Sequence, residues 1–155
     1  MNEDIAVLLN EVRYAERLCQ RTARLYRRVQ AIGVFFTVVG GSAALTALSA
    51  KFPPEVSVAG ALAFAIFGAA LLTIRPADKA SANEADAKRY AKLRADANGM
   101  TEAALRSALD KARESDTAEV EPLRDVAFND VVNEIGQASQ SVRLTMTQRI
   151  LSSLA

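Results

Sequence analysis

Two long stretches without any charged residue dominate the hydropathy pattern of the chain. The first covers residues 29–50 and the second covers residues 56–74. At about 1.5 Å per residue, helices of these lengths would reach roughly 33 and 28 Å, which is close to the hydrocarbon thickness of a bilayer. The connection at residues 51–55 contains Pro53 and Pro54, which favour a tight reversal. The pattern therefore predicts two transmembrane spans, joined as a helical hairpin by an outer turn.

The rest of the chain is strongly charged. Of its 19 basic and 18 acidic residues, only Lys51 and Glu55 lie between residues 29 and 74. Soluble helices seldom lack charge for about five turns, so we favour membrane spans over a buried hairpin in a soluble helical bundle. The expected fold class is an all-α membrane protein with a two-helix transmembrane hairpin at 29–74, long cytoplasmic helices at both ends, and an oligomeric assembly.

Residues 1–28 are expected to form a basic, amphipathic cytoplasmic helix. Apolar and small residues recur there at alternating spacings of three and four, which is typical of a coiled-coil seam. Because no Gly or Pro precedes Gly33, this helix is predicted to continue without a break into the first span. The seam consists of Ile5, Leu8, Val12, Ala15, Cys19, Thr22, Tyr26 and Val29.

Residues 75–155 are predicted to form a helical cytoplasmic tail. One helix covers about 77–97, and Thr101 can cap the next one. A third helix starts near Pro122, and a last, weakly amphipathic helix covers residues 138–154.

The tail carries few side chains for a core of its own. Only 18 of residues 77–155 are Leu, Ile, Val, Phe, Met or Tyr. That is few at a length where independent cores are already marginal. We therefore expect the tail to pack on the N-terminal helix or on neighbouring subunits.

Basic residues flank the two apolar runs on one side of the predicted membrane, while the connecting turn holds one Lys against one Glu. By the positive-inside rule, both termini lie in the cytoplasm and the proline turn lies outside. We expect a multi-pass protein of a bacterial inner (plasma) membrane. The flanking residues are Arg13, Arg17, Arg21, Arg24, Arg27, Arg28, Arg75, Lys79, Lys88, Arg89, Lys92 and Arg94.

The composition argues against chemistry at the usual catalytic sites. The net charge is +1, which gives no general attraction to nucleic acid. With no His and one Cys, the chain lacks usual zinc sites, His-based catalysis and an intrachain disulfide. Carboxylate pairs such as Asp110 and Glu114 lie on charged helix faces, which are usually solvated. We expect no enzyme activity, no cofactor and no metal.

Small residues form a row in each predicted span. Gly33, Thr37 and Gly41 follow one another at intervals of four in the first span. Rows of this kind let helix backbones approach closely in lipid. Packing within the hairpin and packing between subunits both remain open, and we favour the second. The row in the second span consists of Ala61, Ala65 and Ala69.

Ser42, Thr46 and Ser49 lie on one face near the outer end of the first span. Such hydroxyl groups either line a wet pore or donate to carbonyl groups of their own helix. Because no ionisable residue lies in either span, a proton-coupled transporter or a pump is not indicated.

A stripe of arginines follows another face of the N-terminal helix. Arginine here indicates either topology and anionic-lipid contact, which we favour, or a surface that responds to phosphate or nucleotide. The stripe consists of Arg13, Arg17, Arg21, Arg24 and Arg28.

Two segments carry a resemblance to a known family. Residues 17–29, Arg-Leu-Cys-Gln-Arg-Thr-Ala-Arg-Leu-Tyr-Arg-Arg-Val, lead straight into the first run, and residues 121–136 run from Glu-Pro-Leu-Arg to Glu-Ile-Gly. Over roughly residues 10–136 the chain resembles the SLATT group of bacterial two-transmembrane proteins. Members are proposed effectors of nucleotide-linked conflict and antiphage systems that form membrane pores. The resemblance implies this role, and implies that a separate sensor protein or a small ligand supplies the trigger.

We therefore expect an oligomeric membrane protein whose hairpins pack side by side around a pore, gated through its cytoplasmic helices. The alternative is a non-conducting membrane scaffold or adaptor that recruits a cytoplasmic partner. Its expected partners are membrane lipid and further copies of the chain, with no nucleic acid.

Overall fold

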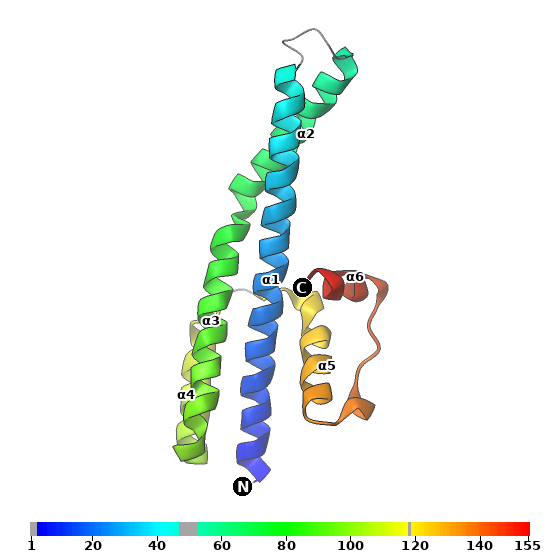
Figure 1. The fold of residues 1–155 in the computed structure, drawn as a ribbon. Coiled ribbons are helices and arrows are strands. Elements are labelled where there is room, and N and C mark those ends of the chain that lie inside the picture. The colour runs from blue at the N-terminus through cyan, green and yellow to red at the C-terminus, as the bar shows by residue number, and fades with distance from the viewer. Residues whose placement is uncertain (1–2, 47–52, 118) are drawn as a thin grey trace. The chain divides into compact units, whose positions relative to one another are not determined.

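The computed structural model describes residues 3–46, 53–117 and 119–155, and every regular element in these ranges is a helix (Figure 1). The expected all-helical class is confirmed. The α-helices are α1 (Glu3–Thr46), α2 (Pro54–Ile74), α3 (Pro76–Asp96), α4 (Glu102–Glu114), α5 (Arg124–Glu134) and α6 (Met146–Leu154). Short 3₁₀ helices are η2 (Ala97–Gly99), η3 (Glu121–Leu123) and η4 (Ala138–Gln140).

The chain divides into two compact units. Unit 1 comprises Met1–Leu25 and Lys79–Ala155, and unit 2 comprises Tyr26–Asp78. Unit 1 therefore combines two segments that are separated in the sequence by the whole of unit 2. The N-terminal helix and the tail belong to the same unit, and each unit is described by itself below.

In unit 1, the N-terminal part of α1 lies between α3 and α4 on one side and α5 and α6 on the other (Figure 1). The first core joins α1 to α3, η2 and α4, and the predicted seam supplies its α1 face. Burial of this face fixes the orientation of α1 in the unit, because apolar area removed from water stabilises the fold. The buried members are Leu8, Val12, Cys19, Ala87, Tyr90, Leu93, Ala97, Leu105, Leu109 and Ala112.

A second core lies on another face of α1. Leu18 and Leu25 of α1 pack there with Val126 of α5, and Leu151 and Leu154 of α6 are partly buried against them. The tail therefore shares both of its cores with α1, as its small number of bulky apolar residues requires.

Local sequence signals set several helix ends in unit 1. The Thr101 hydroxyl accepts a hydrogen bond from the backbone N–H of Ala104 at 3.3 Å, so Thr101 caps α4 as predicted. Gly136 has a φ of 77°, which favours glycine, and it follows the end of α5.

The prediction of one helix over 138–154 is wrong at its start, because α6 begins only at Met146. The Asn129 amide accepts from the backbone N–H of Val142 at 2.7 Å and donates to its carbonyl at 2.8 Å, which occupies both of its backbone groups. Thr145 and Gln148 then form a capping box that starts α6.

In unit 2, α2 matches the second predicted span closely. Pro54 occupies the first turn of α2, a position where proline is tolerated because its missing N–H would have no helical partner. At the other end Arg75 takes a left-handed conformation with a φ of 50°, and its N–H donates to Leu71 at 3.0 Å. Pro76 disfavours a right-handed helical conformation for the residue before it, so α2 and α3 are separate helices.

The first predicted span corresponds to the later part of α1, which ends at Thr46. Residues 47–50 of that span, together with Lys51 and Phe52 of the predicted turn, lie outside the described residues. Within the described ranges, one stretch is long and apolar enough to cross a membrane, and it lies in Pro54–Gly99. Only 11% of its apolar window is buried, which is unlike the core helix of a soluble protein.

Candidate functional site

The candidate site in unit 2 is the pair formed by α2 and the later part of α1. At Gly40, a Cβ atom would lie 2.6 Å from the carbonyl oxygen of Gly60 and 2.8 Å from the backbone nitrogen of Phe64. Since real Cβ atoms do not approach backbone atoms so closely, only glycine fits at this position. The missing side chain lets the two helix backbones come into direct contact.

Two further glycines of α1 receive side chains from α2. A Cβ atom at Gly33 would lie 2.6 Å from a methyl carbon of Leu71, and one at Gly41 would lie 3.1 Å from the ring of Phe64. The rings of Phe36 and Phe67 also stack across the pair, with centroids 4.6 Å apart. These close contacts hold the pair together.

The predicted small-residue rows differ in where they lie. Gly33 and Gly41 face α2, while Thr37 donates from its hydroxyl to the carbonyl of Gly33 at 2.8 Å. The alanine row on α2 is exposed, and consists of Ala61, Ala65 and Ala69. The two rows therefore do not pack against each other. Sequence spacing alone did not single out Gly40 opposite Gly60, because both positions lie beside the rows.

Bulky apolar side chains cover the outer surface of this helix pair. Leu72 is 80% exposed, and Ile66, Val38 and Phe35 are at least 60% exposed. No charged residue interrupts α1 from Val29 to Thr46 or α2 after Glu55. The other exposed bulky residues of the pair are Val29, Ile32, Val34, Phe36, Val39, Val56, Val58, Leu62, Phe64 and Ile74.

The predicted hydroxyl stripe is described only in part. Ser42 is exposed and donates to the carbonyl of Val38 at 2.8 Å, which satisfies its hydroxyl within its own helix. The side chain of Thr46 and the whole of Ser49 lie outside the described residues. Thr73 of α2 likewise donates to Ala69, at 2.9 Å.

Two arginines of the stripe on α1 form ion pairs within unit 1. Arg21 binds both carboxylate oxygens of Asp130 in α5, at 2.8 and 2.9 Å, and donates to the backbone oxygen of Ala155 at 2.7 Å. Arg17 forms an ion pair with Glu134 at 2.8 Å, and this hydrogen bond lowers the pKa of Glu134. Arg17 and Arg21 therefore hold α5 and α6 against α1.

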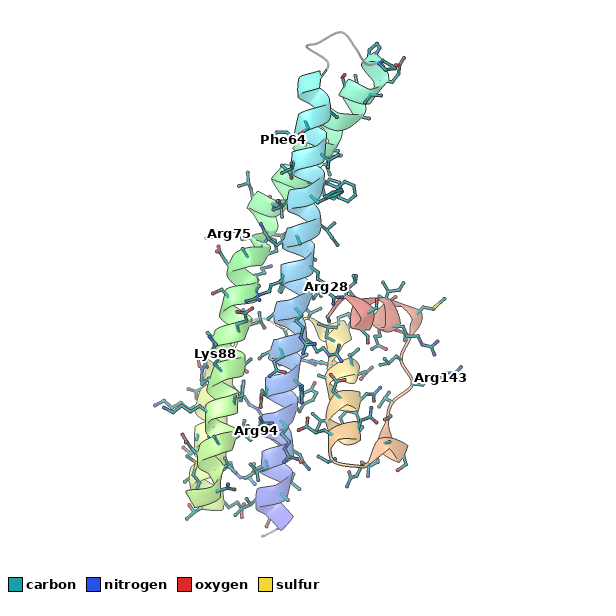
Figure 2. The ribbon with its side chains drawn as sticks, in the orientation of Figure 1. Arg28, Phe64, Arg75, Lys88, Arg94 and Arg143 are labelled. Atoms are coloured by element: carbon teal, nitrogen blue, oxygen red, sulfur yellow. The ribbon has the colours of Figure 1, made fainter. Side chains whose placement is uncertain are left out.

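The other members of the stripe have different surroundings. The Nε atom of Arg13 is buried and has no hydrogen-bond partner among the described residues. Arg24 and Arg28 are exposed, and Figure 2 shows the side chain of Arg28 on α1. Arg17 and Arg21 are engaged within unit 1, and lipid or phosphate contact by this stripe stays a prediction.

A buried polar cluster fixes the chain after α4. Asp86 of α3 accepts from the backbone N–H and the hydroxyl of Thr117, at 2.9 and 2.7 Å, and pairs with Arg89. The hydroxyl of Tyr90 donates to Asp116, and burial together with this bond raises the pKa of Tyr90. These groups largely satisfy one another, as is usual for buried polar side chains, although Oδ1 of Asp116 is buried without a hydrogen-bond partner among the described residues.

Cys19 lies in the first core and is buried. Burial, followed by the nearby carboxylates of Asp116 and Asp86, raises the pKa of its thiol to about 12. Because the thiolate is the reactive form, Cys19 is a structural residue rather than an activated nucleophile.

We expect iodoacetamide at pH 8 to alkylate Cys19 at least about 30-fold more slowly in the native chain than in the unfolded chain, since little thiolate forms. The rate is measured by intact-mass spectrometry. As a control, Ser107→Cys on the exposed face of α4, in a Cys19→Ala background, should react at nearly the unfolded rate. Equal native and unfolded rates at Cys19 would show that the first core is open.

The described residues offer no group of His, Cys, Asp and Glu side chains that could hold a metal ion. Asp110 and Glu114 are exposed on α4. A cavity of about 430 Å³ is lined by Tyr14 and Tyr90 together with charged residues. Three of these take part in ion pairs of 2.8 Å, which join Arg124 to Glu119 and Arg113 to Glu11.

The candidate site of unit 2 is therefore an apolar helix pair whose backbones touch through glycine. Unit 1 is a charged helical unit in which Arg17 and Arg21 of α1 form ion pairs. Compared with known proteins, this chain matches no family model, no curated protein and no solved structure.

Proposed function

We propose that this chain crosses a membrane twice and assembles with further copies of itself into a pore-forming or membrane-perturbing effector, without enzyme activity. The observation that carries the proposal is the exposure of bulky apolar side chains along both helices of unit 2. A soluble monomer seldom leaves a large continuous apolar surface in water. Lipid acyl chains cover such a surface, and helices satisfy their backbone groups internally.

Two crossings are proposed because both helices share this surface. The 21 residues of α2 would reach roughly 31 Å, which is enough to cross the hydrocarbon core. The later part of α1 is equally free of charge, and its Thr37 and Ser42 hydroxyls bond to their own helix. Polar side chains satisfied in this way are compatible with lipid.

The orientation proposed from the sequence is supported by exposed basic residues beyond both helices of the pair. Arg27 and Arg28 precede the first proposed span, and Arg75 follows α2. Lys88 and Lys92 are exposed on α3. By the positive-inside rule, both termini then lie in the cytoplasm of a cell whose inner (plasma) membrane holds the hairpin.

Assembly of several copies is proposed because α2 offers a second close-packing face. The glycines of α1 are occupied within the pair, whereas the row of Ala61, Ala65 and Ala69 is exposed. Rows of small residues spaced by four favour contact between helices in lipid. Copies packed through α2 would leave the Ser42 face of α1 to border a central path.

The resemblance to SLATT proteins supports an effector role in a bacterial defence or conflict system, with a separate sensor protein or nucleotide signal as the trigger. The cytoplasmic helices would receive this signal. A shift of the long α1 helix would then rotate or splay the spans, so that ions leak and the membrane potential falls.

The proposal predicts ion leakage through liposomes that contain the full chain. The chain should remain with membranes after carbonate washing, and bacterial cells that overproduce it should lose membrane potential, as reported by a potential-sensitive dye. Ser42→Asp should alter the ion selectivity of the leak, because a charge at a pore wall attracts counter-ions. Ser107→Asp on exposed α4 is the matched control, and it should leave selectivity unchanged.

If liposomes that contain the chain stayed impermeable to ions with every ligand and partner tested, the proposed pore would be contradicted. The alternative function is a non-conducting scaffold or adaptor. The observation that favours it is the hydrogen bond from Ser42 to its own helix, because this hydroxyl is satisfied without pore water. A scaffold should tolerate Ser42→Asp with recruitment of its partner intact. Release of the chain by carbonate alone would contradict both functions and favour a soluble bundle.

A further inference from the structure

We propose that α6 and the segment before it form a second membrane contact, in which exposed apolar side chains and two arginines bind the surface of an anionic bilayer. This inference rests on the proposed function only for the presence of a membrane beside the chain. Its partner is the lipid headgroup layer, rather than the hydrocarbon core that the hairpin occupies.

The apolar side chains of α6 point in two directions. Leu151 and Leu154 pack against the second core of unit 1. Met146 is 78% exposed and Ile150 is 60% exposed, and they lie one helical turn apart. At about 100° per residue, their directions differ by roughly 40°, so they form one outward strip. Val142, just before the helix, is also exposed.

Hydrogen bonds fix this outward direction. Gln148 donates to Asp125 of α5 at 2.7 Å, and Arg21 of α1 donates to the backbone oxygens of Ser152 and Ala155 at 3.4 and 2.7 Å. The capping box at Thr145 holds the start of the helix. Since α6 cannot turn its strip inward without breaking these contacts, the strip is a stable feature of the surface.

The charges around the strip select the partner. Residues 136–155 contain Arg143 and Arg149 and no acidic side chain. Both arginines are exposed, and the described part of the chain shows no ion pair for either. Figure 2 shows Arg143 directed away from α5 and α6. Apolar residues beside unpaired basic residues are typical of helices that lie in the interface of anionic membranes.

A lipid surface fits this strip better than a protein groove. Apart from Arg149, the polar side chains of α6 are Thr, Gln and Ser, which suit a hydrated headgroup layer. Long arginine side chains can reach lipid phosphates while their stems stay on the apolar strip.

The test places a nitroxide label on the full chain, in a Cys19→Ala background, in vesicles of neutral lipid or of neutral lipid with one-quarter anionic lipid. Ile150→Cys reports on α6, Ser107→Cys on exposed α4, and Ile66→Cys on the hairpin. The accessibility ratio of oxygen to a water-soluble nickel complex measures the depth of each label. We expect this ratio at position 150 to be at least about threefold higher in anionic vesicles, with no change at position 107.

In the double variant Arg143→Glu/Arg149→Glu, the accessibility ratio at position 150 should fall to the ratio measured at position 107. Each basic residue contributes about a factor of five to the binding of anionic lipid, and the variant loses both. A label at position 150 that stays water-exposed in both vesicles would overturn the inference. If the spectrum of the label at position 150 showed equal immobilisation in neutral vesicles and in detergent, the inference would also be overturned, in favour of contact with another protein chain. The label at position 66 tests the proposed function, because a water-exposed label there would contradict membrane crossing by the hairpin. The label at position 150 tests the lipid contact of α6 separately.

Discussion

Replacing Gly40 with alanine will weaken the pairing of α1 and α2, whereas the same replacement at Gly68 will leave it unchanged or strengthen it. The new Cβ atom at position 40 would lie 2.6 Å from the Gly60 oxygen and 2.8 Å from the Phe64 nitrogen. Both are backbone atoms, so the helices must separate, at a cost of about 1–3 kcal/mol or more. At Gly68 no atom lies within 4 Å of the new Cβ, and alanine favours a helix by up to about 1 kcal/mol.

The measurement uses disulfide formation across the helix pair. Phe36→Cys and Phe67→Cys replace two rings whose centroids are 4.6 Å apart, in a Cys19→Ala background. Gly40→Ala should reduce the yield of this cross-link at least about fivefold after brief oxidation, and should lower the temperature at which the purified chain loses its monodisperse state. Equal effects of Gly40→Ala and Gly68→Ala would show that the two backbones are not in contact.

Replacing Arg21 with methionine will release α5 and α6 from α1. Arg21 and Asp130 are 20% and 28% exposed, and two hydrogen bonds join them. Methionine keeps most of the apolar stem but leaves a partly buried carboxylate without its partner, which costs about 2–3 kcal/mol. Amide exchange in α5 should then become about 30- to 150-fold faster, which is the same free energy expressed as local opening.

Two variants distinguish this ion pair from a general effect of charge. Arg24→Met changes an exposed arginine of the same helix, and exchange in α5 should stay within about threefold of the parent chain. Arg21→Met combined with Asp130→Leu removes both charges, and it should recover much of the lost protection. If Arg24→Met accelerated exchange as much as Arg21→Met, the Asp130 pair would not be the anchor.

The sequence predicted the elements of this fold better than their long-range contacts. The absence of Gly and Pro before Gly33 predicted the long α1, and Thr101 predicted the start of α4, because these signals are local in the chain. The start of α6 was missed because Asn129, at a distance along the chain, binds the backbone of Val142. No local periodicity reports such a contact.

In the candidate sites too, the sequence predicted local features better than contacts between distant residues. The charge-free runs indicated an apolar helix pair. The small residues left packing within the pair and packing between copies open, and we favoured the second, whereas Gly33 and Gly41 of the first row pack against α2. Local spacing made Arg21 a candidate for lipid or phosphate contact, yet its partner Asp130 lies 109 positions further along the chain. The pairing of Gly40 with Gly60 likewise depends on how two helices cross, which hydropathy does not specify.

Unit 1 is built from two segments that the ribosome synthesises at different times, because unit 2 lies between them in the sequence. Among the described residues, the part of α1 in unit 1 shares its cores with residues from Lys79 onward, so the whole of unit 2 is synthesised before these partners exist. During that interval the seam of α1 remains unsatisfied, because contacts that are distant in sequence form late. Unit 1 can therefore fold only after both apolar runs have left the ribosome, so its folding follows the synthesis of the whole of unit 2.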